Sequence, residues 1–122
     1  MKIVIADDSS LMRDRIKSLL NGLKEKLVIH EAENGLDALK LIKDIKPDLS
    51  ILDIRMPEMN GIEVLMKIRE LKMKTKICIL TNYAYPQYKK KCFEEGTDYF
   101  LSKSEEFEEI KIIITDMVTN QC

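Results

Sequence analysis

Acidic, hydroxyl and basic side chains recur where the short apolar runs of this sequence end. In chain order, these residues are Asp7, Asp8, Asp53, Thr81 and Lys103. Three carboxylates that share one pocket repel one another unless a cation neutralises them, and oxygen ligands with room for water suit Mg²⁺ or Mn²⁺. The residue types therefore predict a divalent metal site, provided that the fold brings these positions together.

Short apolar runs alternate with amphipathic stretches along the whole chain. The runs are rich in β-branched residues and nearly continuous, which is typical of strands buried on both faces of a parallel sheet. They predict strands over residues 2–6, 27–32, 49–53, 76–80 and 98–101. The stretches between them have helical spacing, with capping residues, Gly or Pro at their ends, and predict helices over about 11–23, 35–45, 62–71, 86–95 and 105–119.

The order of these elements predicts the fold class. Parallel strands need a crossover helix between them, and right-handed crossovers place helices on both faces of the sheet. We therefore expect a doubly wound α/β fold with five parallel strands and five helices. In such folds the ligand site lies past the carboxyl ends of the strands, where the strand order reverses. The polar residues named above all fall at that edge.

The composition limits the kind of protein that this can be. The 122 residues predict one domain over residues 1–122, and a hydrophobic content of 45% supplies a core. Twenty Lys and Arg against 21 Asp and Glu leave a formal net charge of -1, unlike a nucleic-acid or membrane-surface binder. No segment approaches the ~20 apolar residues of a membrane span, and the first apolar run is too short for a signal peptide. We expect a cytoplasmic protein that binds neither nucleic acid nor membrane directly.

Each residue of the expected site also has an ordinary structural explanation. Asp7 and Asp8 could cap the helix that follows them, and Asp53 could be a turn aspartate. Thr81 could bond to nearby backbone, and Lys103 could be a solvated surface lysine. Taken singly, these explanations are favoured, but they give no reason for acids, a hydroxyl and a cation to share one edge of the sheet. The five residues together favour a functional site.

The motifs that contain these residues resemble the receiver domain of two-component response regulators. The matching segments are Asp7-Asp8, Leu52-Asp53-Ile54-Arg55-Met56-Pro57-Glu58-Met59-Asn60-Gly61, Leu80-Thr81 and Phe100-Leu101-Ser102-Lys103. They follow the order of the family and span essentially the whole chain. The resemblance implies a flavodoxin-like sheet with strand order 2-1-3-4-5.

The resemblance also implies a reaction. Asp53 would take a phosphoryl group from the phosphohistidine of a histidine kinase or phosphotransfer protein. A bound Mg²⁺, or Mn²⁺, would offset the charge that develops during this transfer. The metal would be held by Asp8, Asp53 and the backbone carbonyl of Arg55, with Asp7 acting through water, and the phosphoryl oxygens by Thr81 and Lys103.

The expected output starts at Thr81. If phosphorylation draws this side chain inward, the vacated space can admit the aromatic side chain of the last strand, which its spacing from Lys103 identifies as Phe100. Plain core packing explains Phe100 equally well, and Tyr99, on the opposite face of the strand, is the weaker candidate. The switched surface would be the face formed by the helix at 86–95, the strand at 98–101 and the helix at 105–119. We expect it to bind a downstream protein partner or a second copy of the chain.

Residues on two of the predicted helices indicate surfaces that could contact other proteins. Ile112 projects away from the apolar face of its helix and could join a dimer interface. Leu11, Arg15 and Ser18 form a stripe beside the acid pair, which the resemblance makes the kinase-docking edge; burial of Leu11 is an equal alternative.

The positions two beyond Asp53 and Thr81 are both bulky. They are Arg55 and Tyr83, and the family tunes the access of water to the phosphoryl group at these positions. Because large side chains can cover the site, we expect slow autodephosphorylation.

Two other functions compete with a stand-alone signalling domain. A Mg²⁺-dependent aspartyl-phosphate phosphatase or phosphotransferase usually has a second acid just after the nucleophile, whereas Ile54 and Arg55 follow Asp53 here. The chain could also be the receiver of a longer DNA-binding regulator. We expect self-phosphotransfer and autodephosphorylation, with no turnover of an external substrate.

Overall fold

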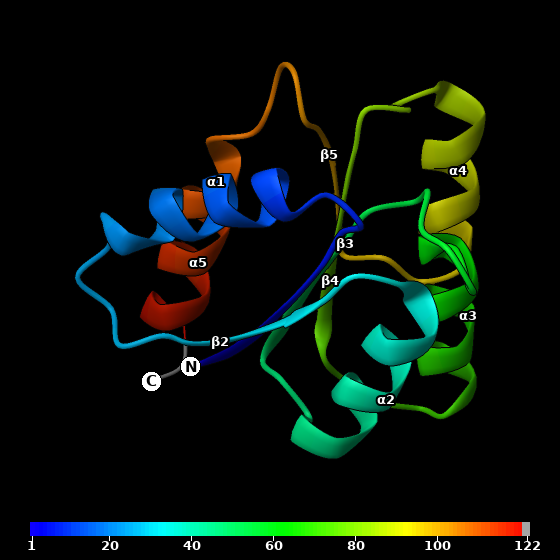
Figure 1. Ribbon diagram of the computed structural model, residues 1–122, viewed down its shortest axis with the longest axis horizontal. Helices are drawn as coiled ribbons and strands as arrows, with labels where there is room; N and C mark the ends of the chain where they lie inside the picture. The colour runs from blue at the N-terminus through cyan, green and yellow to red at the C-terminus, as the bar shows by residue number, and fades with distance from the viewer. Residues whose placement is uncertain (121–122) are drawn as a thin grey trace.

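A computed structural model describes residues 1–120 and shows a parallel sheet between two layers of helices (Figure 1). The strands lie in the order β2-β1-β3-β4-β5, and every neighbouring pair is parallel. Their bounds are β1 Lys2–Ala6, β2 Val28–Ala32, β3 Leu49–Leu52, β4 Lys76–Thr81 and β5 Tyr99–Ser102. The predicted doubly wound fold and its strand order are confirmed.

The helices divide between the two faces of the sheet, as right-handed crossovers require. Figure 1 shows α1 and α5 on one face and α2, α3 and α4 on the other. Their bounds are α1 Ser10–Asn21, α2 Gly35–Ile45, α3 Gly61–Glu70, α4 Pro86–Glu94 and α5 Glu109–Thr119. None of the helices formed by residues 1–120 is both long enough and apolar enough to span a membrane.

The strands bury side chains on both faces, because successive side chains of a strand point in opposite directions. In β1, Val4 packs into the core beneath α2, α3 and α4, while Ile3 and Ile5 pack into the core beneath α1 and α5. Residues of β3 and β4 alternate in the same way. With both faces apolar, polar groups of the central strands are concentrated at the strand ends.

Capping side chains start three helices close to the carboxyl edge of the sheet. Ser9 accepts a hydrogen bond from the Met12 amide at 3.2 Å, so Ser9, and not either of the two aspartates before it, caps α1. Asn34 caps α2 in the same way, and Asn60 forms a reciprocal capping box at the start of α3. Asp7 Oδ1 accepts from the Ser9 amide at 2.9 Å, so Asp7 Oδ2 and the Asp8 carboxylate remain for another role.

The start of the last helix differs from the prediction. We expected a helix from residue 105, but α5 begins at Glu109, so Glu105 and Glu106 are not in its first turn. Glu106 instead closes a turn after β5: its amide donates to the Ser102 carbonyl at 2.9 Å, and its carboxylate accepts from the Ser102 amide at 3.0 Å. Other boundaries shift by a residue or two; β4 for example includes Thr81.

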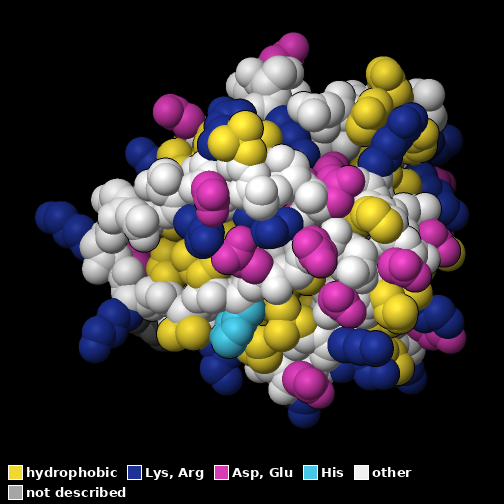
Figure 2. Space-filling model, in the orientation of Figure 1, with side chains coloured by type: hydrophobic (Ala, Val, Ile, Leu, Met, Phe, Trp, Pro, Cys, Tyr) yellow, Lys and Arg dark blue, Asp and Glu magenta, His cyan; other side chains and the backbone are white. Residues whose placement is uncertain are grey.

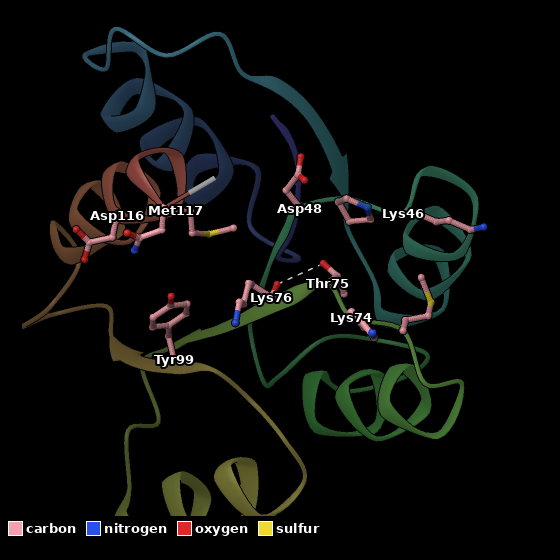
Figure 3. Close-up of a pocket in the computed structure, with 11 residues that line it drawn as sticks. Lys46, Asp48, Lys74, Thr75, Lys76, Tyr99, Asp116 and Met117 are labelled. Atoms are coloured by element: carbon pink, nitrogen blue, oxygen red, sulfur yellow. Dashed lines mark hydrogen bonds between the residues drawn. The ribbon is translucent and has the colours of Figure 1, made fainter. Parts of the chain in front are cut away.

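The opposite edge of the sheet, at the amino ends of the strands, carries a groove of ≈ 790 Å³. Figure 3 shows Tyr99, Lys76 and Met117 bordering this groove from β5, β4 and α5. On the face shown in Figure 2, acidic and basic side chains are interspersed.

Candidate functional site

The polar residues at the carboxyl ends of the strands meet because the strands are in parallel register. The Asp53 amide donates to the Ala6 carbonyl at 3.0 Å, which brings the residues that follow β1 and β3 side by side. The Lys103 amide donates to the Thr81 carbonyl at 3.0 Å, which does the same for β4 and β5. The structure thus assembles the predicted residues at one edge.

A buried lysine links two of the aspartates. The Nζ atom of Lys103 donates to Asp7 Oδ2 at 2.7 Å and to Asp53 Oδ2 at 3.1 Å. The three side chains are only 6%, 3% and 8% exposed, respectively. An ammonium group has three protons, so these two bonds leave one proton for another acceptor. Lys103 is therefore not a solvated surface lysine, and it can still bind an oxygen that enters the pocket.

The third aspartate completes an acidic cluster at the mouth of this pocket. One carboxylate oxygen from each of Asp7, Asp8 and Asp53 lies within 4.8 Å of the others, and Asp8 is exposed. With Lys103, three carboxylates and one ammonium give a formal charge of -2 (−3 + 1). Clustered hard oxygens carrying this charge fit Mg²⁺ or Mn²⁺.

Burial has opposite effects on the acid and the base of the pocket. Burial raises the pKa of the Asp53 carboxyl, the nearby charge of Lys103 opposes this, and Asp7 adds to the increase, so that the pKa of Asp53 is raised. Burial would lower the pKa of Lys103, but its bonds to both carboxylates outweigh this and raise it. Lys103 therefore stays charged, while an additional cation would favour the ionised form of Asp53.

The loop after Asp53 packs closely against it. The Gly61 amide donates to the Ile54 carbonyl at 2.7 Å, and a Cβ atom at Gly61 would collide with the Asp53 carbonyl oxygen. The glycine that ends the Asp53 motif is thus required because the first turn of α3 approaches the backbone of Asp53.

Thr81 lies fully buried at the end of β4. Its Oγ1 accepts a hydrogen bond from the Tyr83 amide at 3.0 Å, so the hydroxyl is oriented and its proton can be donated to an oxygen in the pocket. Phe100 is 6% exposed and belongs to the core beneath α2, α3 and α4, whereas Tyr99 packs on the other face. The structure shows Phe100 in a buried position, and its movement on phosphorylation stays a prediction.

Two contacts near the pocket were not predicted from the sequence. The Arg55 guanidinium lies over the Tyr83 ring, 3.9 Å from its centroid, so the two bulky positions stack on each other. Arg13 donates to the Asp7 carbonyl oxygen at 2.6 Å and to Glu31 Oε1 at 2.9 Å. Sequence spacing gives no signal for Arg13, because its partners lie at the end of β1 and on β2.

Leu11 and Ile112, two apolar residues considered for protein contacts, are both exposed. Leu11 is 71% exposed, so the alternative in which it is buried is wrong. It borders a groove with Arg15, Ser18 and Phe107 between α1 and α5, where the Arg15 guanidinium lies 4.9 Å from the Phe107 ring centroid. Ile112 is 57% exposed, which confirms that it points away from the core.

Comparison with known proteins shows the family. A family model described as response regulator receiver domain matches residues 3–115. A solved structure of a DNA-binding response regulator of the LuxR family from Staphylococcus aureus is 34% identical, with a TM-score of 0.86 over 95% of this chain and 97% of that one. The chain therefore belongs to the receiver domain family of response regulators, which act in two-component signalling.

Curated relatives differ in length. A chemotaxis protein CheY from Halobacterium salinarum is 30% identical over 97% of both chains. A putative transcriptional regulator from Pseudomonas aeruginosa is 35% identical over 89% of this chain but only 52% of its own length. The chain thus spans about half the length of some of the relatives that it matches.

Proposed function

We propose that this receiver domain, as one unit over residues 1–122, accepts a phosphoryl group on Asp53 and transmits a signal by changing its surface. The observation that carries the proposal is the buried lysine that joins Asp53 to Asp7 beside the exposed carboxylate of Asp8. Such an arrangement holds an acid nucleophile, a cation for the incoming phosphoryl oxygens and an incomplete set of metal ligands in one pocket.

The transfer uses the Asp53 carboxylate as the nucleophile. An Asp53 oxygen attacks the phosphorus of a phosphohistidine in line with the departing imidazole. The new oxygen–phosphorus bond forms as the phosphorus–nitrogen bond breaks, and the electron pair of the broken bond stays on the histidine nitrogen. Lys103 would bind one phosphoryl oxygen through its third proton, and Thr81 would donate its hydroxyl to another.

A divalent cation would be held by the same acids. Asp8, Asp53 and the backbone carbonyl of Arg55 would be its ligands, with Asp7 acting through water. When bound, it supplies positive charge to the carboxylate and phosphoryl oxygens, which must approach one another during the transfer. Its charge would also oppose the increase in the pKa of Asp53 that burial causes.

The change at the surface would start from the contacts of Thr81. Its hydroxyl accepts from the amide of Tyr83, so drawing Thr81 toward a phosphoryl oxygen pulls on the loop that leads into α4. Phe100 and α4 contribute to the same core, which makes the α4, β5 and α5 face the proposed site for a protein partner or a second copy. Exposed Ile112 supports this choice.

The proposed donor is a cytoplasmic histidine kinase domain or a phosphotransfer protein. Leu11 is a large apolar side chain beside the acidic cluster, and the groove between α1 and α5 continues from it. Exposed apolar groups next to a reactive pocket are suited to a transient protein contact. We propose no turnover of an external substrate, because Ile54 and Arg55 follow Asp53 and supply no second acid.

One experiment tests the phosphoacceptor function directly. The protein is incubated with radiolabelled acetyl phosphate and Mg²⁺, and the acid-stable, alkali-labile label on the protein is measured. We expect labelling of the wild type and of Asp44→Asn, which removes an exposed acid on α2, and no labelling of Asp53→Asn. Equal labelling of Asp53→Asn and wild type, or an unlabelled wild type that binds Mg²⁺, would overturn the proposal.

A specific observation also favours a place in a longer regulator. The Pseudomonas aeruginosa relative, named as a putative transcriptional regulator, extends well beyond the matched region. In such a protein, the proposed output face would contact a DNA-binding region of the same polypeptide. The full open reading frame distinguishes this arrangement from that of the CheY relative, which matches this chain over nearly its whole length.

A further inference from the structure

Arg13 makes a contact that no other described residue makes: it binds the peptide group between the two neighbouring aspartates. Its Nη1 donates to the Asp7 carbonyl oxygen at 2.6 Å, and its Nε donates to Glu31 Oε1 at 2.9 Å. The Arg13 side chain is 14% exposed, and its bond to the Asp7 carbonyl is partly buried, whereas its bond to Glu31 lies at the surface. A charged donor on a carbonyl makes a stronger hydrogen bond than a neutral donor.

The Asp7 carbonyl matters because it belongs to the peptide that leads into Asp8. A peptide group is planar, so the direction of the Asp7 carbonyl also determines the direction of the Asp8 amide. On the other side of the residue, the Asp7 amide donates to the Ala32 carbonyl at 3.1 Å. Arg13 therefore holds the backbone at the point where the sheet ladder ends and the acidic pair begins.

The position of Arg13 is itself held by an ion-pair network on β2. The second oxygen of Glu31 accepts from Lys17 Nζ at 2.8 Å, while the first binds Arg13. Bonds to Lys17 and Arg13 lower the pKa of Glu31, so its carboxylate stays charged at neutral pH. The network links β2, α1 and the Asp7 carbonyl through one guanidinium group.

We propose that Arg13 is a positioning residue for the divalent-cation site, a proposal that rests on the proposed function. The Asp7 carboxylate is already held by the Ser9 amide and by Lys103, so the fixed Asp7–Asp8 peptide matters mainly for Asp8: it sets the direction from which Asp8 meets Asp7 and Asp53 before the cation arrives. Groups that orient metal ligands typically change metal affinity by about 10- to 100-fold when removed. Without Arg13, binding of the cation would also have to order the Asp8 backbone, which costs binding free energy.

The test measures Mn²⁺ binding by the unphosphorylated full chain with electron paramagnetic resonance, which reports free Mn²⁺ and needs no catalysis. We expect Arg13→Ala to weaken Mn²⁺ binding by roughly tenfold. Arg13→Lys keeps the positive charge but loses the planar fork with which the guanidinium binds both partners at once, so we expect an intermediate affinity. If Arg13→Ala fails to fold, the Mn²⁺ affinity of Arg13→Lys tests the inference instead.

Two controls separate positioning from general stability. Lys17→Met removes the other partner of Glu31 without touching Asp7, and Arg69→Ala removes a guanidinium that binds backbone carbonyls at the far edge of the sheet. Arg69→Ala should bind Mn²⁺ as the wild type does. Lys17→Met loosens Glu31 but keeps the Arg13 bond to the Asp7 carbonyl, so it should lose less affinity than Arg13→Ala. An unchanged Mn²⁺ affinity in Arg13→Ala and Arg13→Lys would overturn this inference but not the proposed function. A loss in Arg69→Ala as large as that in Arg13→Ala would do the same. A wild type that binds no Mn²⁺ would overturn the proposed function together with it.

Discussion

The two edges of the sheet each hold a cationic side chain among backbone and acidic groups. They differ in the charge that remains uncompensated and in the donors that remain for a ligand. At the amino edge, Arg69 donates to the carbonyls of Gly96, Met73 and Thr75 and to the Asp98 carboxylate, all within 3.0 Å. Lys76 Nζ also lies 3.6 Å from Asp98, so two cations meet one acid, and four of the five Arg69 donors are used. At the carboxyl edge, Lys103 meets Asp7 and Asp53 and keeps a free donor.

This difference separates a structural site from a site that can bind a ligand. Around Asp98 the cations outnumber the acid, so nothing in that network calls for another cation. Around Lys103 the acids outnumber the cation, and buried carboxylates without full compensation are costly. The carboxyl edge therefore gains from a divalent cation and a phosphoryl group, while the amino edge fastens the loops before β4 and β5.

The largest effect should follow from Lys103→Met. Asp7 and Asp53 would stay buried without their cation, which we expect to lower the free energy of unfolding at pH 7 by about 3 kcal/mol. The loss should shrink as the pH falls and Asp53 takes up a proton. Urea denaturation at pH 7 and pH 5, without metal, measures it. Lys91→Met, which removes an exposed pair with Glu95, should cost about 0.5 kcal/mol or less; equal losses in both variants would erase the contrast between buried and surface pairs.

Arg69→Ala tests the amino edge. It leaves three carbonyls and Asp98 without their shared donor, so we expect a loss of about 2 kcal/mol in the free energy of unfolding. The rate of labelling by acetyl phosphate should remain that of the wild type, because the carboxyl edge is untouched. Slower labelling of the folded variant would show that the two edges of the sheet are coupled.

Asp53→Asn should stabilise the protein. The pKa of Asp53 is raised in the folded state, so ionising this carboxyl opposes folding, and the opposition grows as the pH rises through the folded pKa. Replacing it with a neutral amide should add about 1 kcal/mol at pH 7, and the gain should shrink as the pH falls into the range in which the folded protein protonates Asp53. Thermal unfolding in the presence of a chelator measures this gain. A variant less stable than the wild type at pH 7 would mean that the bond to Lys103 outweighs the cost of burial.

The smallest effect concerns the mouth of the carboxyl edge. Tyr83→Ala removes the ring on which Arg55 stacks, a contact worth about 0.5–1 kcal/mol at an exposed site. If the stack restricts water, the half-life of the phosphorylated protein should shorten by roughly two- to fivefold. Tyr83→Phe keeps the ring and should retain the wild-type half-life. An unchanged half-life in Tyr83→Ala would contradict the expected slow autodephosphorylation.

Much of the fold followed from local patterns in the sequence. Continuous apolar runs predicted the strands because a strand buried on both faces needs apolar side chains at every position, as β3 has apart from Ser50. Strand ends could be identified for the same reason, since Asp53 and Lys103 are the polar residues that follow such runs. The convergence of these two with Asp7 was predictable because parallel strands share their carboxyl edge.

Contacts between separate elements were decided by the tertiary structure. The start of α5 depends on a bond between Glu106 and Ser102, which competes with helix formation and has no periodic signature. Arg13 looks like any exposed helical arginine until β2 brings Glu31 beside it and β1 presents the Asp7 carbonyl. The sequence by itself determined the elements and the chemistry at their ends, because periodicity and residue type are local. Only the tertiary structure decided which donor meets which acceptor, because that depends on how neighbouring elements pack.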